Sequence, residues 1–207
     1  MITEFHKRII SSLFLIPIAL FFIIKGSNSF IFFLLIFFLI NSYEWLKMTK
    51  NKILLVFGFI FLFLSTYSAY LIRGSDDSNL LIFLLVILIS VSTDIGGYVC
   101  GKIFKGPKLI KISPNKTYAG LLGSYLFSII FVKIYIYYFN LIGLPNIYVL
   151  TFLISSISQI GDIIISYFKR ISKIKDTGII LPGHGGLLDR TDGMIFAIPF
   201  YFIFYNL

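Results

Sequence analysis

The stretch GDIIISYFKRISKIKDTGIILPGHGGLLDRTDG, residues 161–193, joins the two kinds of sequence that decide the fold of this 207-residue chain. It begins as the apolar end of a hydrophobic run and becomes a polar loop with a glycine-rich turn. Three of its acids, Asp162, Asp189 and Asp192, lie inside or beside apolar segments. A charge at membrane depth costs about 2.5–3.5 kcal/mol on insertion scales, so an acid there usually marks function. We therefore expect a membrane scaffold that holds this stretch at a membrane surface.

The composition indicates that lipid is the solvent of most of the chain. Hydrophobic residues make up 58% of it and charged residues 13%, well below the roughly 25% of soluble domains. The mean hydropathy is +0.95. The net charge of +9 falls on basic residues between apolar runs, where it sets topology and attracts anionic lipid or nucleotide phosphate. We therefore expect no nucleic-acid partner. The single cysteine, Cys100, excludes an internal disulfide.

Seven apolar runs predict an all-α, polytopic membrane bundle of about seven transmembrane helices. Most are near the roughly 20 residues that a spanning helix needs. They are apolar on all sides, which favours helices over the alternating strands of a barrel. No internal repeat is visible, so we expect one transmembrane domain, 1–207, with N-terminal helices in 1–89 and a catalytic part in 90–207. The apolar runs cover residues 9–24, 28–46, 53–72, 80–98, 119–139, 146–168 and 193–207.

The positions of Lys and Arg predict the orientation of the chain. With the N-terminus in the cytoplasm, only Lys25 and Arg73 fall in outer segments, and Lys133 falls within the fifth run. The other basic residues fall in inner segments, as the positive-inside rule requires. The two polar loops, 99–118 and 169–192, then face the cytoplasm, where nucleotides are. The first run lacks a small-residue cleavage site, which favours a retained helix over a cleaved signal peptide.

Acids from three runs are predicted to meet at one depth below the cytoplasmic surface. Asp94 and Asp162 lie near the inner ends of the fourth and sixth runs, and Asp189 and Asp192 begin the seventh. Converging carboxylates repel unless a cation joins them, and Mg²⁺ takes such oxygen ligands. Two structural alternatives stay open: helix capping for Asp189 and Asp192, and an ion pair with a basic neighbour for Asp162.

Basic and glycine-rich segments are candidates for binding phosphate. The turn PGHGG, residues 182–186, contains His184, Gly185 and Gly186 and lets the backbone approach a ligand at a helix start. Lys116 and Thr117 follow a Ser-Pro turn near another helix start. Arg170 and Arg190 are candidate phosphate clamps, because a guanidinium binds phosphate oxygens in pairs. The alternatives are an ordinary loop histidine, ordinary positive-inside residues, and tight helix packing for Gly96, Gly97, Gly101 and Gly106.

Acids for metal, cations for phosphate and a glycine turn at the inner face together indicate a reaction class. They suit transfer of a phosphate-containing group between a soluble nucleotide and a lipid, in which the protein mainly positions charge. These features do not identify the base of the nucleotide or the kind of lipid.

At these residues the chain resembles the phosphatidate cytidylyltransferase (CDP-diacylglycerol synthase) family. The similarity covers roughly residues 90–193, with two upstream blocks at 94–102 and 113–117. One departure is Ala119, where the family often has a glutamate. The family motif is matched by Ser166, Lys169, Arg170, Lys175, Asp176, Pro182, Gly183, His184, Gly185, Gly186, Asp189, Arg190 and Asp192.

The resemblance implies that phosphatidate and CTP form CDP-diacylglycerol and pyrophosphate with Mg²⁺, and it leaves room for a second cation. It implies metal ligands at Asp162, Asp189 and Asp192. It further implies a homodimer in a bacterial cytoplasmic membrane. Two further residues complete the expected catalytic set, His184 and Lys175. The expected substrate contacts are Lys169, Arg170, Arg190, Ser166, Lys116, Thr117, Gly185, Gly186 and Asp94.

Two other functions fit parts of the pattern. A CTP-dependent kinase of a polyprenol or another lipid would use similar acids but would release CDP. An ion-coupled transporter would use the acids to line an ion path. That hypothesis lacks an internal repeat and leaves the glycine turn and the loop lysines without a role.

Overall fold

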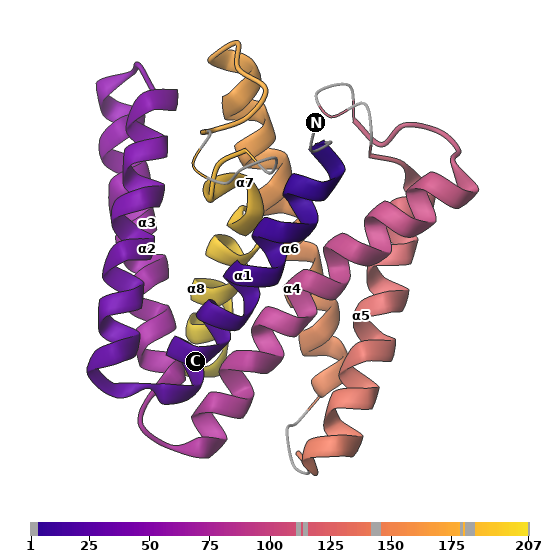
Figure 1. Cartoon of the computed structure of the whole chain (residues 1–207). Helices are drawn as coiled ribbons and strands as arrows, with labels where there is room; N and C mark the ends of the chain where they lie inside the picture. The colour runs from indigo at the N-terminus through magenta and orange to yellow at the C-terminus, as the bar shows by residue number, and fades with distance from the viewer. Residues whose placement is uncertain are drawn as a thin grey trace. The chain divides into compact units, whose positions relative to one another are not determined.

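The computed structural model describes residues 4–110, 113, 116–141, 146–178, 180 and 185–206, with the backbone alone for residues 4–12 and 206. All regular elements in this part are helices, which confirms the all-α class (Figure 1). An isolated bridge pairs Lys108 with Thr117. The helices are α1 (Glu4–Lys25), α2 (Ser27–Met48), α3 (Lys52–Arg73), α4 (Asp77–Phe104), α5 (Tyr118–Phe139), α6 (Ile147–Ile171), α7 (Leu188–Thr191) and α8 (Met194–Asn206).

Among the residues that the structure describes, five helices, α2 to α6, are long and apolar enough to cross a membrane. The apolar part of α1, Leu13–Lys25, and the apolar part of α8, Met194–Tyr205, are shorter. The chain is therefore an integral membrane protein by its helices, while the count of seven spans and the cytoplasmic N-terminus stay predictions.

Three predicted boundaries differ from the structure. Helix α4 continues to Phe104, so residues 99–104 are helical and not part of the first polar loop. The helix ends where Lys105 and Gly106 take positive φ angles of 52° and 101°. Helix α6 continues to Ile171, past the predicted end of its apolar run. The last run starts at α8, and Asp189 belongs to the separate single-turn helix α7.

The chain forms two compact units, which are described separately. The first unit contains Met1–Leu80 and Phe168–Asp192, and therefore α1 to α3, the second polar loop and α7. The second unit contains Leu81–Tyr167 and Gly193–Leu207, and therefore most of α4, α5, most of α6, and α8.

In the first unit, α2 and α3 form a helical hairpin through a short connection. Asn51 caps α3, because its side chain accepts hydrogen bonds from the backbone N–H groups of Ile53 (2.9 Å) and Leu54 (3.5 Å). Trp45 on α2 donates its indole N–H to the Leu55 carbonyl (3.3 Å) and packs edge-on against Phe168. A β-carbon at position 58 would overlap the Trp45 ring, which explains glycine there.

Arg73 closes the other end of this unit. Its buried guanidinium donates to the carbonyls of Ile23 (2.7 Å) and Ile24 (3.0 Å) at the end of α1. The last carbonyls of a helix have no partner within the helix and carry its negative dipole end, so a cation stabilises them.

In the second unit, α4 and α5 cross at glycines. A β-carbon at Gly96 would overlap the Gly123 carbonyl, and a β-carbon at Gly120 would lie 2.8 Å from the Gly97 carbonyl. The tight-packing interpretation is thus confirmed for Gly96, Gly97 and Gly101, but not for Gly106, where an added β-carbon would meet no atom within 4 Å. Buried hydroxyls add hydrogen bonds: Ser124 to the Thr93 carbonyl and Thr93 to Ser155, each 2.8 Å.

We expect Gly96→Ala to destabilise the protein more than Gly101→Ala. Both changes gain up to about 1 kcal/mol of helix propensity. A methyl group at position 96 meets rigid backbone, whereas the nearest atom at position 101 is a threonine hydroxyl at 3.2 Å. Overpacking of the first kind costs about 1–3 kcal/mol. Thermal unfolding in detergent should show the larger drop for Gly96→Ala, and equal midpoints would contradict this packing.

Candidate active site

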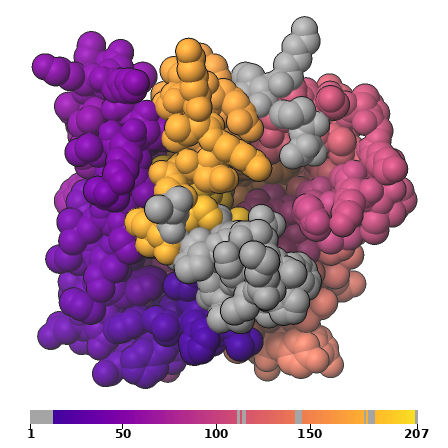
Figure 2. All heavy atoms as spheres, turned by 45° about the horizontal axis from the view of Figure 1, so that its top comes forward, coloured from indigo at the N-terminus to yellow at the C-terminus, as the bar shows by residue number. Residues whose placement is uncertain are grey.

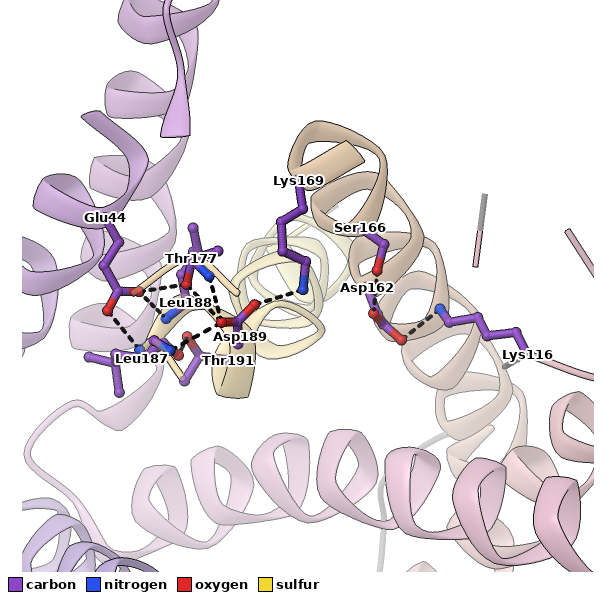
Figure 3. Close-up of polar contacts among 11 residues, drawn as sticks. Glu44, Lys116, Asp162, Ser166, Lys169, Thr177, Leu187, Leu188, Asp189 and Thr191 are labelled. Carbon is purple, nitrogen blue, oxygen red and sulfur yellow. Dashed lines mark hydrogen bonds and ion pairs between the residues drawn. The ribbon is translucent and has the colours of Figure 1, made fainter. Parts of the chain in front are cut away.

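Asp189 is held in place by four hydrogen bonds within the first unit. Lys169 on α6 donates to Oδ1 at 2.6 Å. Three donors meet Oδ2: the Thr177 backbone N–H at 2.7 Å, the Thr177 hydroxyl at 3.1 Å and the Gly186 N–H at 3.1 Å (Figure 3). The side chain is only 7% exposed. Asp189 therefore fixes the loop that follows α6.

These donors keep Asp189 ionised. Burial alone would raise the pKa of its carboxyl group, but the hydrogen bonds from Lys169, Thr177 and Gly186 outweigh burial and lower the pKa below its usual value. Asp189 is therefore a carboxylate at neutral pH. Its Oδ2 accepts from the N–H groups of Thr177 and Gly186 and lies within reach of the Thr177 hydroxyl, which Glu44 shares. Among the described residues, the partner of Oδ1 is the ammonium group of Lys169.

Asp162 has its own lysine in the second unit. Its carboxylate lies 2.6 Å from the Lys116 ammonium group and accepts a hydrogen bond from Ser166, one turn along α6, at 3.2 Å. Lys116 also donates to the Gln159 carbonyl at 3.4 Å. The basic neighbour that the sequence left open for Asp162 is thus Lys116, which comes from the first polar loop (Figure 3).

The ends of that loop pair and so position Lys116. The Leu109 N–H donates to the Lys116 carbonyl at 2.8 Å, and the Tyr118 N–H donates to the Pro107 carbonyl at 3.2 Å. Thr117 then begins α5 as its N-cap, because its hydroxyl accepts from the Gly120 N–H at 3.1 Å. The predicted phosphate contacts Lys116 and Thr117 therefore have structural partners in this unit.

Three exposed cations lie at the end of α6, on the second polar loop and on α7. Arg170, Lys175 and Arg190 are exposed, and the segment at the end of α6, orange in Figure 2, stands out on the face shown. For Arg170 and Lys175 the structure gives no ion pair with any residue it describes.

The other predicted site residues are placed as follows. Asp192 is 7% exposed and ends α7, and Asp94 is exposed on α4. Gly185 has a φ of +87°, which favours glycine. His184 lies outside the described residues. Asp189 and Asp192 belong to the first unit, and Asp94 and Asp162 to the second. In the described part of the chain, no three His, Cys, Asp or Glu side chains form a group that could hold a metal ion.

Glu44 is a site residue that the sequence analysis missed. It lies on α2 and is 1% exposed. Its carboxylate accepts hydrogen bonds from the backbone N–H groups of Leu187 (2.9 Å) and Leu188 (2.8 Å) and from the Thr177 hydroxyl (2.9 Å). An acid inside the apolar run 28–46 was the available signal, because an ionisable residue at membrane depth needs a partner.

Three backbone N–H groups before and at the start of α7 therefore already have partners. The sequence suggested that they would receive phosphate at a helix start. Instead, Gly186 donates to Asp189, while Leu187 and Leu188 donate to Glu44. Helix α7 is only four residues long, so its dipole is also small. Carboxylates of the protein take the place expected for an anionic ligand.

Residues 51–207 match the sequence model described as the cytidylyltransferase family, which covers most of the chain. The chain belongs to the cytidylyltransferase family. Among its relatives is the phosphatidate cytidylyltransferase of Rickettsia typhi (strain ATCC VR-144 / Wilmington), 36% identical over 95% of this chain and 90% of the relative. That of Bacillus subtilis (strain 168) is 40% identical over 64% of this chain and 50% of the relative. Family membership confirms the resemblance seen in the sequence.

The family match begins after Glu44, at residue 51. The acids and cations at 162–192 lie inside it, and so does Lys116. Glu44 thus joins this cytidylyltransferase loop from a part of the chain that the family model does not include.

We expect Lys169→Met to destabilise the cytidylyltransferase more than Lys116→Met. Both changes keep an apolar stem and remove the charge. The Lys169–Asp189 side chains are 12% and 7% exposed, and loss of one buried partner costs about 1–3 kcal/mol. The Lys116–Asp162 side chains are 21% and 31% exposed, where a pair contributes below about 1 kcal/mol. Thermal unfolding in detergent measures both, and the reverse order would contradict the assigned burial.

Proposed function

We propose that this protein is a phosphatidate cytidylyltransferase, which transfers CMP from CTP to phosphatidate and yields CDP-diacylglycerol and pyrophosphate. The observation that carries the proposal is the near full-length similarity to the Rickettsia typhi enzyme of that name. Five helices that can span a membrane suit a lipid substrate, and the exposed cations beside α6 suit a triphosphate.

The reaction needs charge to be offset more than it needs protons to be moved. A phosphate oxygen of phosphatidate attacks the α-phosphorus of CTP in line. The new oxygen–phosphorus bond forms as the bond to the β-phosphate oxygen breaks, and pyrophosphate leaves with that electron pair. The attacking phosphate is already an anion at neutral pH, so the step does not depend on a general base.

The cations of the second polar loop are proposed to offset this charge. Arg170 and Arg190 present guanidinium groups that bind phosphate oxygens in pairs, and Lys175 adds a third exposed charge. Lys169 is the fourth cation proposed for this role. Its flexible stem lets its ammonium group move from Asp189 to a phosphate oxygen. These cationic groups are proposed to stabilise the charge of the departing pyrophosphate.

Asp162, Asp189 and Asp192 are proposed to hold Mg²⁺, alone or with a second cation. The chemistry of the donors fits: Asp189 is ionised, and the single partner of its Oδ1 is a cation that another cation can replace. Bound Mg²⁺ would neutralise negative charge on the triphosphate. His184 is proposed as a catalytic residue and Asp176 as the residue that orients a lysine, and Ser166 supports Asp162 through its hydrogen bond.

The proposed location is a bacterial cytoplasmic membrane with the active site facing the cytoplasm, and the proposed assembly is a homodimer. The relatives are bacterial proteins. The second polar loop and the first are rich in lysine, as cytoplasmic loops are.

The proposed reaction is tested with two labels in CTP. Purified protein in detergent is given phosphatidate, Mg²⁺ and CTP labelled at the α- or the γ-phosphate. We expect α-label in lipid and γ-label in pyrophosphate. The γ-label in lipid, with release of CDP, would instead show a lipid kinase. No lipid product from folded protein at several Mg²⁺ concentrations would overturn the proposal, and ion uptake by liposomes would then favour a transporter.

Asp192→Asn should lower kcat by at least about 100-fold, because a neutral amide is a weaker partner for cationic groups in the transition state. The matched control is Asp77→Asn, which removes an exposed acid at the start of α4. Both variants should unfold at similar temperatures. A near wild-type rate for Asp192→Asn would remove Asp192 from the proposed site.

A further inference from the structure

Glu44 connects α2 to a loop more than 130 residues later in the chain. Its Oε1 accepts from Leu187, and its Oε2 accepts from Leu188 and Thr177. All of these distances are between 2.8 and 2.9 Å, and the side chain is 1% exposed. A buried carboxylate without such donors would be strongly destabilising. The three donors explain how the acid is tolerated at this place.

This contact acts as a helix cap. The N-cap residue of α7, Leu187, has no side-chain cap hydrogen bond, and leucine has no acceptor to offer. Glu44 supplies the acceptor from another helix. The fit is close, because a β-carbon at Gly178 would lie 2.7 Å from Oε1, and a β-carbon at Gly186 would overlap Oε2. Glycine at both positions lets the loop backbone close around the carboxylate.

Thr177 links Glu44 to Asp189. Its hydroxyl oxygen lies 2.9 Å from Glu44 Oε2 and 3.1 Å from Asp189 Oδ2, and a hydroxyl has one hydrogen to donate. The Thr177 backbone N–H also donates to Asp189. Glu44 thus fixes both sides of Asp189: Thr177 before it in the chain, and α7, on which it lies (Figure 3).

We propose that Glu44 is a positioning residue for nucleotidyl transfer, which sets the orientation of the Asp189 carboxylate through Thr177 and the N–H groups of Leu187 and Leu188. The inference rests on the proposed function, because Asp189 matters to the rate only if the loop acts on CTP. Glu44 itself touches no substrate.

A second link between the loop and α2 provides the control. Ser172 donates its hydroxyl to the Met48 carbonyl at 2.6 Å. Ser172→Ala therefore weakens the attachment of the same loop to the same helix without touching Glu44, Thr177 or Asp189. Glu44→Gln keeps the shape of the side chain but turns one acceptor into a donor, which then faces an N–H group or the Thr177 hydroxyl.

The test compares Glu44→Gln, Glu44→Asp, Thr177→Val and Ser172→Ala in detergent with phosphatidate and labelled CTP. We expect Glu44→Gln to lower kcat by about 10–100-fold, as loss of a supporting group does at other sites, with the KM for phosphatidate unchanged. Glu44→Asp should recover part of the rate because it keeps both acceptor oxygens. Ser172→Ala should keep the wild-type kcat. The kcat losses of Glu44→Gln and Thr177→Val should not add in the double variant.

Hydrogen exchange gives a readout that needs no turnover. Glu44→Gln should speed amide exchange at Leu187 and Leu188, and Ser172→Ala should not. A wild-type kcat in Glu44→Gln, additive losses with Thr177→Val, or an equal kcat loss in Ser172→Ala would overturn the inference. If Glu44→Gln does not fold, Glu44→Asp and Thr177→Val carry the same comparison. No lipid product from the wild type would instead overturn the proposed function, and exchange would still decide whether Glu44 holds α7.

Discussion

The first unit depends on supplying hydrogen-bond donors to two acidic side chains where little water reaches them. Glu44 is buried and the Asp189 side chain nearly so. One short loop offers them five donors, four backbone N–H groups and the Thr177 hydroxyl that lies near both acids, and Lys169 donates to Asp189. The acids also stabilise the loop, because these backbone N–H groups of the loop have no partners in a strand ladder or a helix and are satisfied by the carboxylates. Removal of either carboxylate would leave several donors unsatisfied at once.

The need to compensate acidic side chains also explains the positions of Lys116 and Lys169. Acids that lie near membrane-spanning helices need compensating charge, and the sequence analysis assigned that role to a metal ion. In the structure Lys116 meets Asp162 and Lys169 meets Asp189, each at 2.6 Å. A lysine ammonium is a compact charge on a flexible stem, so it can hold a carboxylate and still move to a phosphate. In the proposed reaction these two lysines would serve both the fold and the charge balance of the site.

In the second unit, hydrogen bonds between hydroxyls and close contacts at glycines hold the helices together. Thr93, Ser124 and Ser155 satisfy one another or backbone carbonyls between three helices. Gly96 and Gly123 let α4 and α5 approach until backbone meets backbone. Lipid gives helices no hydrophobic reason to associate, so close packing and buried hydrogen bonds must hold them together. The long helix α6, which carries Asp162 and Ser166, packs in this unit by such contacts.

The sequence by itself determined the helical class, the apolar spans and the loop with the cytidylyltransferase motif. These depend on the composition of continuous runs and on the spacing of neighbouring residues. Only the tertiary structure decided that Glu44 holds α7, that Lys116 pairs with Asp162, and that the N–H groups of Gly186, Leu187 and Leu188 donate to protein carboxylates. Each of these contacts joins residues that lie far apart in the chain or depends on how a loop folds. Hydropathy and spacing carry no information on such partners, because a buried polar group can be satisfied by any donor that the fold brings within about 3 Å.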